Sequence, residues 1–245
     1  MTEAAYAIDG AERTGRWLVT CDHATNIVPD WLGGSLGLPE ADMGRHIAYD
    51  IGALGLARAL GELLDGPVIS TRFSRLVIDP NRGEDDPTLL MKLYDGTIIP
   101  ANRRADAAER EHRLDLCYRP YHAALGKLAD ARADTVIVSV HSFTPQFRGR
   151  PLRPWHVGLL YADDTRLSLP MLDLLRREPG LNVGANQPYS GHLTGDTIDR
   201  HAIAYGRQNT LIEVRNDLIR DDAGQAEWAD RFAQILPEAL ATADT

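Results

Sequence analysis

The sequence has few cysteines, no excess of basic residues and no long hydrophobic run. Among 245 residues there are two cysteines, Cys21 and Cys117, which lie far apart in a strand-like and a helix-like segment. Two such thiols indicate neither a disulfide framework nor a cysteine-based zinc site. The 26 lysine and arginine residues are outnumbered by 35 aspartate and glutamate residues, and the formal charge of −9 argues against a nucleic-acid partner.

No stretch approaches the roughly 18 consecutive apolar residues that indicate a membrane span, and residues 1–6 lack the basic and apolar regions of a secretory signal. We therefore expect a cytoplasmic protein with no membrane partner. The content of 44% hydrophobic and 25% charged residues is typical of a globular protein. Because no repeat or flexible linker divides the chain, we expect a single domain over residues 1–245, of unknown oligomeric state.

Short apolar runs alternate with amphipathic stretches along the chain. This alternation predicts an α/β fold, in which a mixed, mainly parallel sheet is flanked by helices. The expected strands are residues 17–21, 68–72, 75–79, 134–141, 157–161 and 210–214. The expected helices are residues 41–64, 101–133 with a kink or break at Pro120, 167–177 and 223–240, and residues 84–100 are expected to form a surface loop.

Polar residues follow four of the predicted strands, at the edge of an α/β sheet where ligands bind. These positions are 22–23, 79–82, 141–142 and 213–217. A histidine at a strand end is more often structural than a ligand, but His23 and His141 occupy equivalent positions on two strands. Two imidazoles and a carboxylate at one edge would make a zinc site with an open position, as hydrolysis requires.

Four segments, in order along the chain, resemble the N-formylglutamate amidohydrolase family. They are residues 21–29 (CDHATNIVP), 45–52 (RHIAYDIG), 74–82 (SRLVIDPNR) and 186–191 (NQPYSG). The resemblance extends from about Trp17 to Asp217. It implies one amidohydrolase domain similar in fold to zinc-dependent exopeptidases and to aspartoacylase. It also implies a zinc-dependent hydrolase of linear amide bonds, with one divalent ion and a small anionic N-acyl amino acid, such as N-formylglutamate, as its substrate.

By this resemblance His23 and His141 are the nitrogen ligands of the metal. In the carboxypeptidase pattern the acidic ligand stands three residues after the first histidine, but that position here is Asn26, whose amide is a poor zinc ligand. We therefore prefer Asp50 as the third ligand, with Asn26 and Asp22 as alternatives. If Asp22 is not a ligand, we expect it to contact a ligand residue or to cap a loop. If Asp50 is not a ligand, we expect it to be a charge near the start of a helix, where the helix dipole favours it.

Glu213 lies inside an apolar segment, where a carboxylate has to be paired, neutralised or functional. It resembles the general base of the carboxypeptidases, which takes a proton from the attacking water. The alternative is a structural ion pair with Arg215 or another arginine.

The turn after the third predicted strand resembles the asparagine–arginine clamp of aspartoacylase. The resemblance implies that Asn81 and Arg82 bind the substrate carboxylate, with Arg82 supplying two parallel donors. We expect Arg75 and Arg215 to add positive charge to the same pocket, and Tyr189 to donate a hydrogen bond from a glycine-rich loop. The alternative is that Arg75 and Arg215 are surface residues and that the loop with Tyr189 is an ordinary exposed loop.

Motifs of other enzyme classes are missing from the sequence. It has no dinucleotide fingerprint, no P-loop and no Gly-x-Ser-x-Gly elbow. The competing hypothesis is a non-catalytic small-ligand-binding protein of the same fold with an incomplete metal site, which Asn26 suggests.

Overall fold

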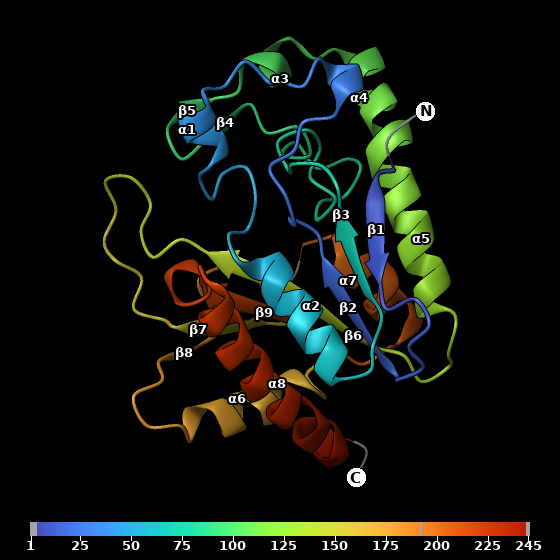
Figure 1. Cartoon of the computed structure of the whole chain (residues 1–245), viewed down its shortest axis with the longest axis vertical. Helices are drawn as coiled ribbons and strands as arrows, with labels where there is room; N and C mark the ends of the chain where they lie inside the picture. Colours follow the sequence, from blue (N-terminus) through green and yellow to red (C-terminus); the bar gives the residue numbers. More distant parts are fainter. Residues whose placement is uncertain (1–3, 192, 244–245) are drawn as a thin grey trace.

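The structure is a computed structural model that describes residues 4–191 and 193–243. Its centre is a seven-stranded mixed sheet of order β1-β3-β2-β6-β9-β7-β8 (Figure 1). The four central strands run parallel: β3 (Val68–Thr71), β2 (Trp17–Cys21), β6 (Val136–Phe143) and β9 (Asn209–Arg215). On one side β1 (Tyr6–Asp9) is antiparallel to β3; on the other, β7 (Val157–Leu160) is antiparallel to β9 and parallel to β8 (Val183–Ala185). The predicted α/β fold class is confirmed.

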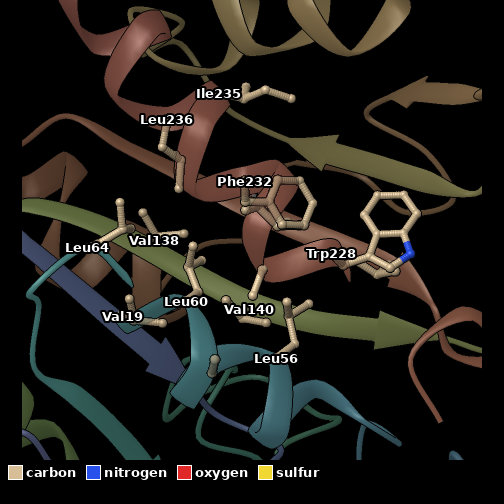
Figure 2. Packing of buried hydrophobic residues seen from close by; sticks show 14 of the residues in the cluster. Val19, Leu56, Leu60, Leu64, Val138, Val140, Trp228, Phe232, Ile235 and Leu236 are labelled. Atoms are coloured by element: carbon tan, nitrogen blue, oxygen red, sulfur yellow. The ribbon is translucent and has the colours of Figure 1, made fainter. Parts of the chain in front are cut away.

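Helices cover both faces of the sheet. One face carries α2 (Ala53–Leu63), α6 (Ser168–Arg176) and α8 (Asp222–Ala243), and the other carries α5 (Arg119–Ala129) and α7 (Thr197–His201) (Figure 1). The larger core lies under the first group, where Leu56, Leu60 and Phe232 pack over Val138 and Val140 (Figure 2). None of the helices in the described part of the chain combines the length and apolar character needed to cross a membrane.

Strand β6 is buried along its whole length, and its two sets of side chains meet different helices. Val138 and Val140 belong to the core under α2 and α8, whereas Ile137 packs in the cluster that contains Leu125 of α5. Successive side chains of a strand point to opposite faces. His141 therefore lies on the same face as Ile137, beneath α5 and α7.

Residues 75–79, predicted as a strand, form turns instead. The backbone N–H of Val77 donates to the carbonyl of Ser74, and Arg75 and Asp79 are joined through their side chains. The apolar residues between them pack in a third cluster, separate from the sheet core, under loops beyond the carboxyl ends of the strands. These apolar residues thus pack beneath loops and not in the sheet. The sequence pattern of a buried strand is the same in both cases, so it cannot tell them apart.

The predicted helix over residues 41–64 is two helices. Turns separate α1 (Glu40–Met43) from α2, and the N-cap of α2, Gly52, has a φ of 82° that favours glycine. Asp50 lies in these turns and not in a helix. Its backbone N–H donates to the carbonyl of His23 at 2.9 Å, which anchors the turn beside β2.

The segment 101–133 consists of several helical pieces. They are α3 (Pro100–Arg104), α4 (Ala107–Arg113), a π-helical turn (Leu114–Tyr118) and α5. Pro120 lies in the first turn of α5, directly after the π-helical turn, and the backbone is helical on both sides of it, so the chain does not break there. The expected loop 84–100 contains a small hairpin, β4 (Leu93–Tyr94) and β5 (Thr97–Ile98). Short 3₁₀ helices complete the chain at Asp30–Leu32, Ile203–Tyr205 and Asn216–Leu218.

Candidate active site

A cavity of about 280 Å³ opens where the carboxyl ends of the parallel strands meet the overlying loops. His23 follows β2, His141 lies in β6 and Glu213 lies in β9, so three neighbouring strands each carry one polar side chain to the cavity. This is the edge of an α/β sheet at which ligands bind.

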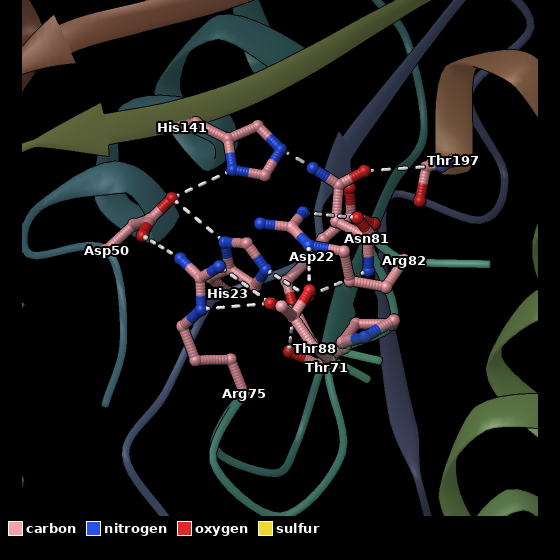
Figure 3. Close-up of polar contacts among 12 residues, drawn as sticks. Asp22, His23, Asp50, Thr71, Arg75, Asn81, Arg82, Thr88, His141 and Thr197 are labelled. Atoms are coloured by element: carbon pink, nitrogen blue, oxygen red, sulfur yellow. Dashed lines mark hydrogen bonds and ion pairs between the residues drawn. The ribbon is translucent and has the colours of Figure 1, made fainter. Parts of the chain in front are cut away.

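The side chains of His23, Asp50 and His141 converge in the cavity (Figure 3). Asp50 Oδ2 lies 3.2 Å from His23 Nδ1 and 2.8 Å from His141 Nδ1. The potential ligand atoms of the three residues lie within 4.8 Å of one another, and all three side chains are buried. The structure thus brings together the three residues expected to bind the metal.

The far side of each imidazole ring contacts a second carboxylate. His23 Nε2 lies 2.7 Å from Asp79 Oδ1, and His141 Nε2 lies 3.3 Å from Asp22 Oδ2. Carboxylates placed in this way orient metal-binding histidines and raise their basicity. Two imidazoles held with their Nδ1 atoms toward one carboxylate fit a divalent metal ion that takes nitrogen and oxygen ligands.

The two alternative third ligands lie elsewhere. Asp22 is on the Nε2 side of His141, and its Oδ1 accepts a hydrogen bond from the Tyr121 hydroxyl at 2.5 Å. The Asn26 side chain donates to the carbonyl of Met43 at 2.9 Å. These contacts leave Asp50 as the carboxylate between the two histidines.

The electrostatics of this group favour positive charge. Burial acts to lower the pKa of His141, but the hydrogen bonds to Asp22 and Asp50 outweigh it and raise that pKa to about 10. Burial acts to raise the pKa of Asp50, yet the two histidines hold it below its ordinary value. Several carboxylates buried within one small volume therefore attract a cation.

Arg75 lines the cavity, but its donors are engaged. Its Nη2 and Nε donate to Asp79 Oδ2 at 2.6 and 3.1 Å, and its Nη1 lies 3.6 Å from Asp50 Oδ1. Burial opposes the charge of this guanidinium, but Asp79 more than compensates and raises its pKa. Arg75 thus holds two of the carboxylates in place.

Asn81 and Arg82 line the cavity in the turn that follows Asp79 (Figure 3). Asn81 Oδ1 accepts a hydrogen bond from the backbone N–H of Thr197, which anchors the turn to α7. Arg82 donates from Nε to the Thr88 hydroxyl at 3.1 Å and from Nη1 to the Asn81 carbonyl at 2.6 Å. No described residue accepts a hydrogen bond from its Nη2, which leaves that nitrogen for a ligand.

Glu213 is buried beside His141, its partner in the β6–β9 register. Its Oε2 has no hydrogen-bond partner among the residues described. Burial raises the pKa of Glu213 to about 8. A buried, unpaired carboxyl group in a cavity beside a candidate metal site is the setting of a general base.

Two other predicted site residues have different placements. The guanidinium of Arg215 pairs with Asp217 at 2.8 Å. Arg215 is not among the residues that line the cavity, so it does not add the positive charge that we expected it to bring to the pocket. It also forms no ion pair with Glu213. Tyr189 does line the cavity, and its hydroxyl accepts a hydrogen bond from Arg153 at 3.0 Å, which leaves its proton free to be donated.

Sequence reasoning missed several residues that line the cavity. They include His46, Tyr94, Leu160, Leu193, Asp196 and Leu211. Asp196 carries a local signal, because Asp-x-x-Asp is typical of a helix start, and its side chain does accept from the N–H of Asp199. The leucines carry no signal in the sequence that separates a cavity wall from an ordinary core.

Comparisons with known proteins agree with this geometry. A family model described as N-formylglutamate amidohydrolase matches residues 15–220. The crystal structure of a gene product from Agrobacterium tumefaciens is 34% identical, with a TM-score of 0.94 over 100% of this chain and 98% of that chain. An N-formylglutamate amidohydrolase from Ralstonia eutropha JMP134 is 21% identical, with a TM-score of 0.72 over 98% of this chain and 97% of that chain. A comparison with curated protein sequences found no significant match.

Proposed function

Because the chain belongs to the N-formylglutamate amidohydrolase family, we propose that it is a zinc-dependent enzyme that hydrolyses the amide bond of an N-acyl amino acid. The observation that carries the proposal is the position of Glu213. Its unpaired, buried carboxyl group lies in the same cavity as the three converging side chains of His23, Asp50 and His141. The family supports amide hydrolysis in general.

In this proposal His23, Asp50 and His141 hold the zinc ion. Two imidazoles and one carboxylate are a frequent ligand set of catalytic zinc. When bound, the ion polarises the amide carbonyl and makes water a better nucleophile near neutral pH. Asp79 and Asp22 fix the two imidazole rings through their Nε2 atoms, so that both Nδ1 atoms stay directed at the ion.

Glu213 is the proposed proton carrier of the reaction. Its carboxylate takes a proton from the attacking water and then delivers that proton to the nitrogen of the leaving amine. The side chain fits this task because no described residue holds its Oε2. Burial, which raises the pKa of Glu213 to about 8, increases its affinity for a proton.

Arg82 and Asn81 are the proposed binding residues for the substrate carboxylate. Arg82 offers an uncommitted Nη2, and the turn that carries it is fixed on both sides by Asp79 and Thr197. Tyr189 is the proposed hydrogen-bond donor to the substrate, which its position in the cavity lining supports. The substrate is thus a small anionic N-acyl amino acid, held so that its amide faces Glu213.

The competing hypothesis, a ligand-binding protein with an incomplete metal site, rested on Asn26. It loses that support because Asp50 lies between the two histidines, where a third ligand belongs. The test is metal analysis of the purified protein together with an assay of N-formyl amino acid hydrolysis before and after chelation. We expect about one zinc per chain and activity that chelation abolishes and zinc restores. If the protein binds N-formyl amino acids without hydrolysing them, whatever its metal content, the competing hypothesis of a ligand-binding protein is correct.

A further inference from the structure

The loop between β6 and β7 places the guanidinium of Arg153 next to the cavity. Its Nη1 donates to the carbonyl of Thr144 at 3.2 Å and to the hydroxyl of Tyr189 at 3.0 Å, and both acceptor residues line the cavity. The guanidinium also lies 4.0 Å from the ring centroid of Phe147 and 4.9 Å from that of Tyr189. Aromatic faces at such distances attract a cation. Arg153 is therefore held beside the lining of the cavity.

These contacts leave one edge of the guanidinium unused. Among the described residues, none accepts a hydrogen bond from Nε or Nη2 of Arg153, since both of its side-chain hydrogen bonds use Nη1. Nε and Nη2 are neighbouring donors on the same edge of the planar group. Two parallel donors of this kind match the two oxygens of a carboxylate. Arg153 thus offers a complete two-donor fork.

The charge of Arg153 acts on groups that line the cavity. Burial raises the pKa of Glu213 and lowers that of His46. The positive charge of Arg153 opposes the first shift and adds to the second, and both affected residues line the cavity. Arg153 thus supplies the positive charge that we expected from Arg215.

The arginines of the lining itself have fewer donors to offer. Arg75 is engaged with Asp79 and Asp50, and Arg82 retains only Nη2, because its other donors hold the turn. Every N-acyl amino acid has an α-carboxylate, so the proposed role of Arg82 is to bind this shared group. A second carboxylate on the substrate needs a second cation, since an unpaired buried charge is strongly unfavourable.

From these observations, and resting on the proposed hydrolytic function, we infer that Arg153 is a specificity-determining residue that binds the side-chain carboxylate of the substrate through Nε and Nη2. Arg82 binds the α-carboxylate in the same complex. Each carboxylate of a dicarboxylic N-acyl amino acid is thus paired with one guanidinium. The bonds from Nη1 to Thr144 and Tyr189 hold the fork in place before the substrate arrives, which reduces the entropy lost on binding.

N-formylglutamate and N-formylglutamine form the matched pair of substrates that tests this inference. They share the α-carboxylate, the length and the shape, and they differ in the charge of the side chain. At pH 7.5 both carboxylates of N-formylglutamate are ionised. We expect kcat/KM of the wild type to be about 10- to 100-fold higher for N-formylglutamate, the scale of hydrogen bonds to a charged group.

Arg153→Gln removes the charge and the fork. We expect this variant to bring the two kcat/KM values to within about 3-fold of each other, mainly by slowing the reaction of N-formylglutamate. A role of Arg153 that is only structural, acting through Tyr189, lowers both values alike and therefore leaves their ratio unchanged. Arg153→Lys keeps the charge without the fork, and its ratio should lie between those of the wild type and Arg153→Gln.

Two further variants serve as controls. Arg150→Gln removes the same charge from an exposed position in the same loop and should keep the wild-type ratio. Arg82→Lys should lower both kcat/KM values alike, because both substrates have the α-carboxylate. A wild-type ratio near one, an unchanged ratio in Arg153→Gln, or an equal loss of preference in Arg150→Gln overturns the inference. If Arg153→Gln does not fold, Arg153→Lys decides: a reduced ratio supports the fork, and the wild-type ratio contradicts it.

A binding measurement separates this inference from the proposed function. If the protein hydrolyses neither compound, the hydrolytic function fails, and titration calorimetry with the two compounds still decides the role of Arg153. Tighter binding of N-formylglutamate than of N-formylglutamine by the wild type, with the difference lost in Arg153→Gln, supports that role. Equal binding of the two compounds, a difference that Arg153→Gln keeps, or binding of neither compound contradicts it.

Discussion

The carboxylate of Asp50 lies 2.8 Å from Nδ1 of His141, although 91 positions separate the two residues in the chain. The contact joins a turn before α2 to the end of the central strand β6. It also directs the imidazole of His141 toward His23, whose Nδ1 lies 3.2 Å from the same carboxylate oxygen. One carboxylate oxygen of Asp50 thus links the two histidines of the proposed metal site.

Replacing Asp50 should therefore remove the metal. We expect Asp50→Asn to lose most of the zinc that the wild type retains after dialysis, because a neutral amide is a poor zinc ligand. Asn26→Ala is the matched control: its side chain contacts the Met43 carbonyl, so this variant should keep the metal. Elemental analysis of both proteins provides the measurement. Zinc retained in Asp50→Asn and lost in Asn26→Ala would assign the third ligand to Asn26.

Asp22 should affect the metal more weakly, through His141. Asp22→Asn keeps the size of the side chain but weakens the contact with His141 Nε2 at 3.3 Å. Loss of such a partner typically reduces metal affinity by about 10- to 100-fold. Competition with a calibrated chelator measures the zinc affinity. An affinity equal to that of the wild type argues against this positioning role, and complete loss would indicate that Asp22 is itself a ligand.

Arg82 should bind the substrate carboxylate through Nη2, while its Nε and Nη1 hold the guanidinium in place by donating to Thr88 and Asn81. Arg82→Lys keeps the charge but loses that geometry, and we expect kcat/KM for N-formyl amino acids to fall by about 10- to 100-fold, the scale of a charged hydrogen bond. Arg215→Lys is the control, since Arg215 pairs with Asp217 outside the cavity and should keep normal kinetics. Normal kcat/KM in Arg82→Lys would remove Arg82 from the substrate site.

The histidine pair His122–His201 should make the protein sensitive to acid. His122 Nε2 donates to the Pro80 carbonyl at 3.0 Å, and its Nδ1 accepts from His201 Nε2 at 2.9 Å, so both rings are neutral in this arrangement. Burial, reinforced by the positive charge of Arg200, lowers the pKa of His122 to about 3 and that of His201 to about 4.

These pKa values set the direction of the pH dependence. Below about pH 6.5 the unfolded chain protonates both histidines, whereas the folded protein does not until about pH 4. The contribution of this pair to the free energy of unfolding should therefore be largest above pH 6.5 and fall as the pH drops toward 4. Denaturant unfolding across this range measures it, and His122→Gln, which keeps a donor for the Pro80 carbonyl, should show a flatter profile. A variant with an undiminished pH slope would contradict this assignment.

Much of the fold could be predicted from local sequence, but not the pieces that depend on packing. Strands β2, β6 and β9 were predicted because a run of buried apolar residues bounded by polar ones is typical of the centre of a parallel sheet. Residues 75–79 have the same pattern, yet they pack beneath loops and form turns. The edge strands β1 and β8 were missed because they are short and only partly buried.

Sequence could predict those residues of the candidate site that lie at the ends of the predicted strands. His141 and Glu213 lie on neighbouring parallel strands and His23 follows the next strand, so strand ends alone place them together. Arg215 follows the same rule, but Asp217, two residues on, draws its guanidinium away from the cavity. Asp196 and the leucines around it come from a distant loop and from β7 and β9, and only the tertiary structure shows that they share one cavity with Glu213.

The turnover of Glu213→Gln tests the proposed hydrolytic mechanism most directly. Glutamine keeps the shape of the side chain but cannot accept a proton, so the variant should retain its zinc and its melting temperature. Its kcat on N-formyl amino acids should fall by about 100-fold or more, the scale of general-base catalysis. A Glu213→Gln protein that melts normally, carries zinc and turns over at the wild-type rate would leave the proposed reaction without its base.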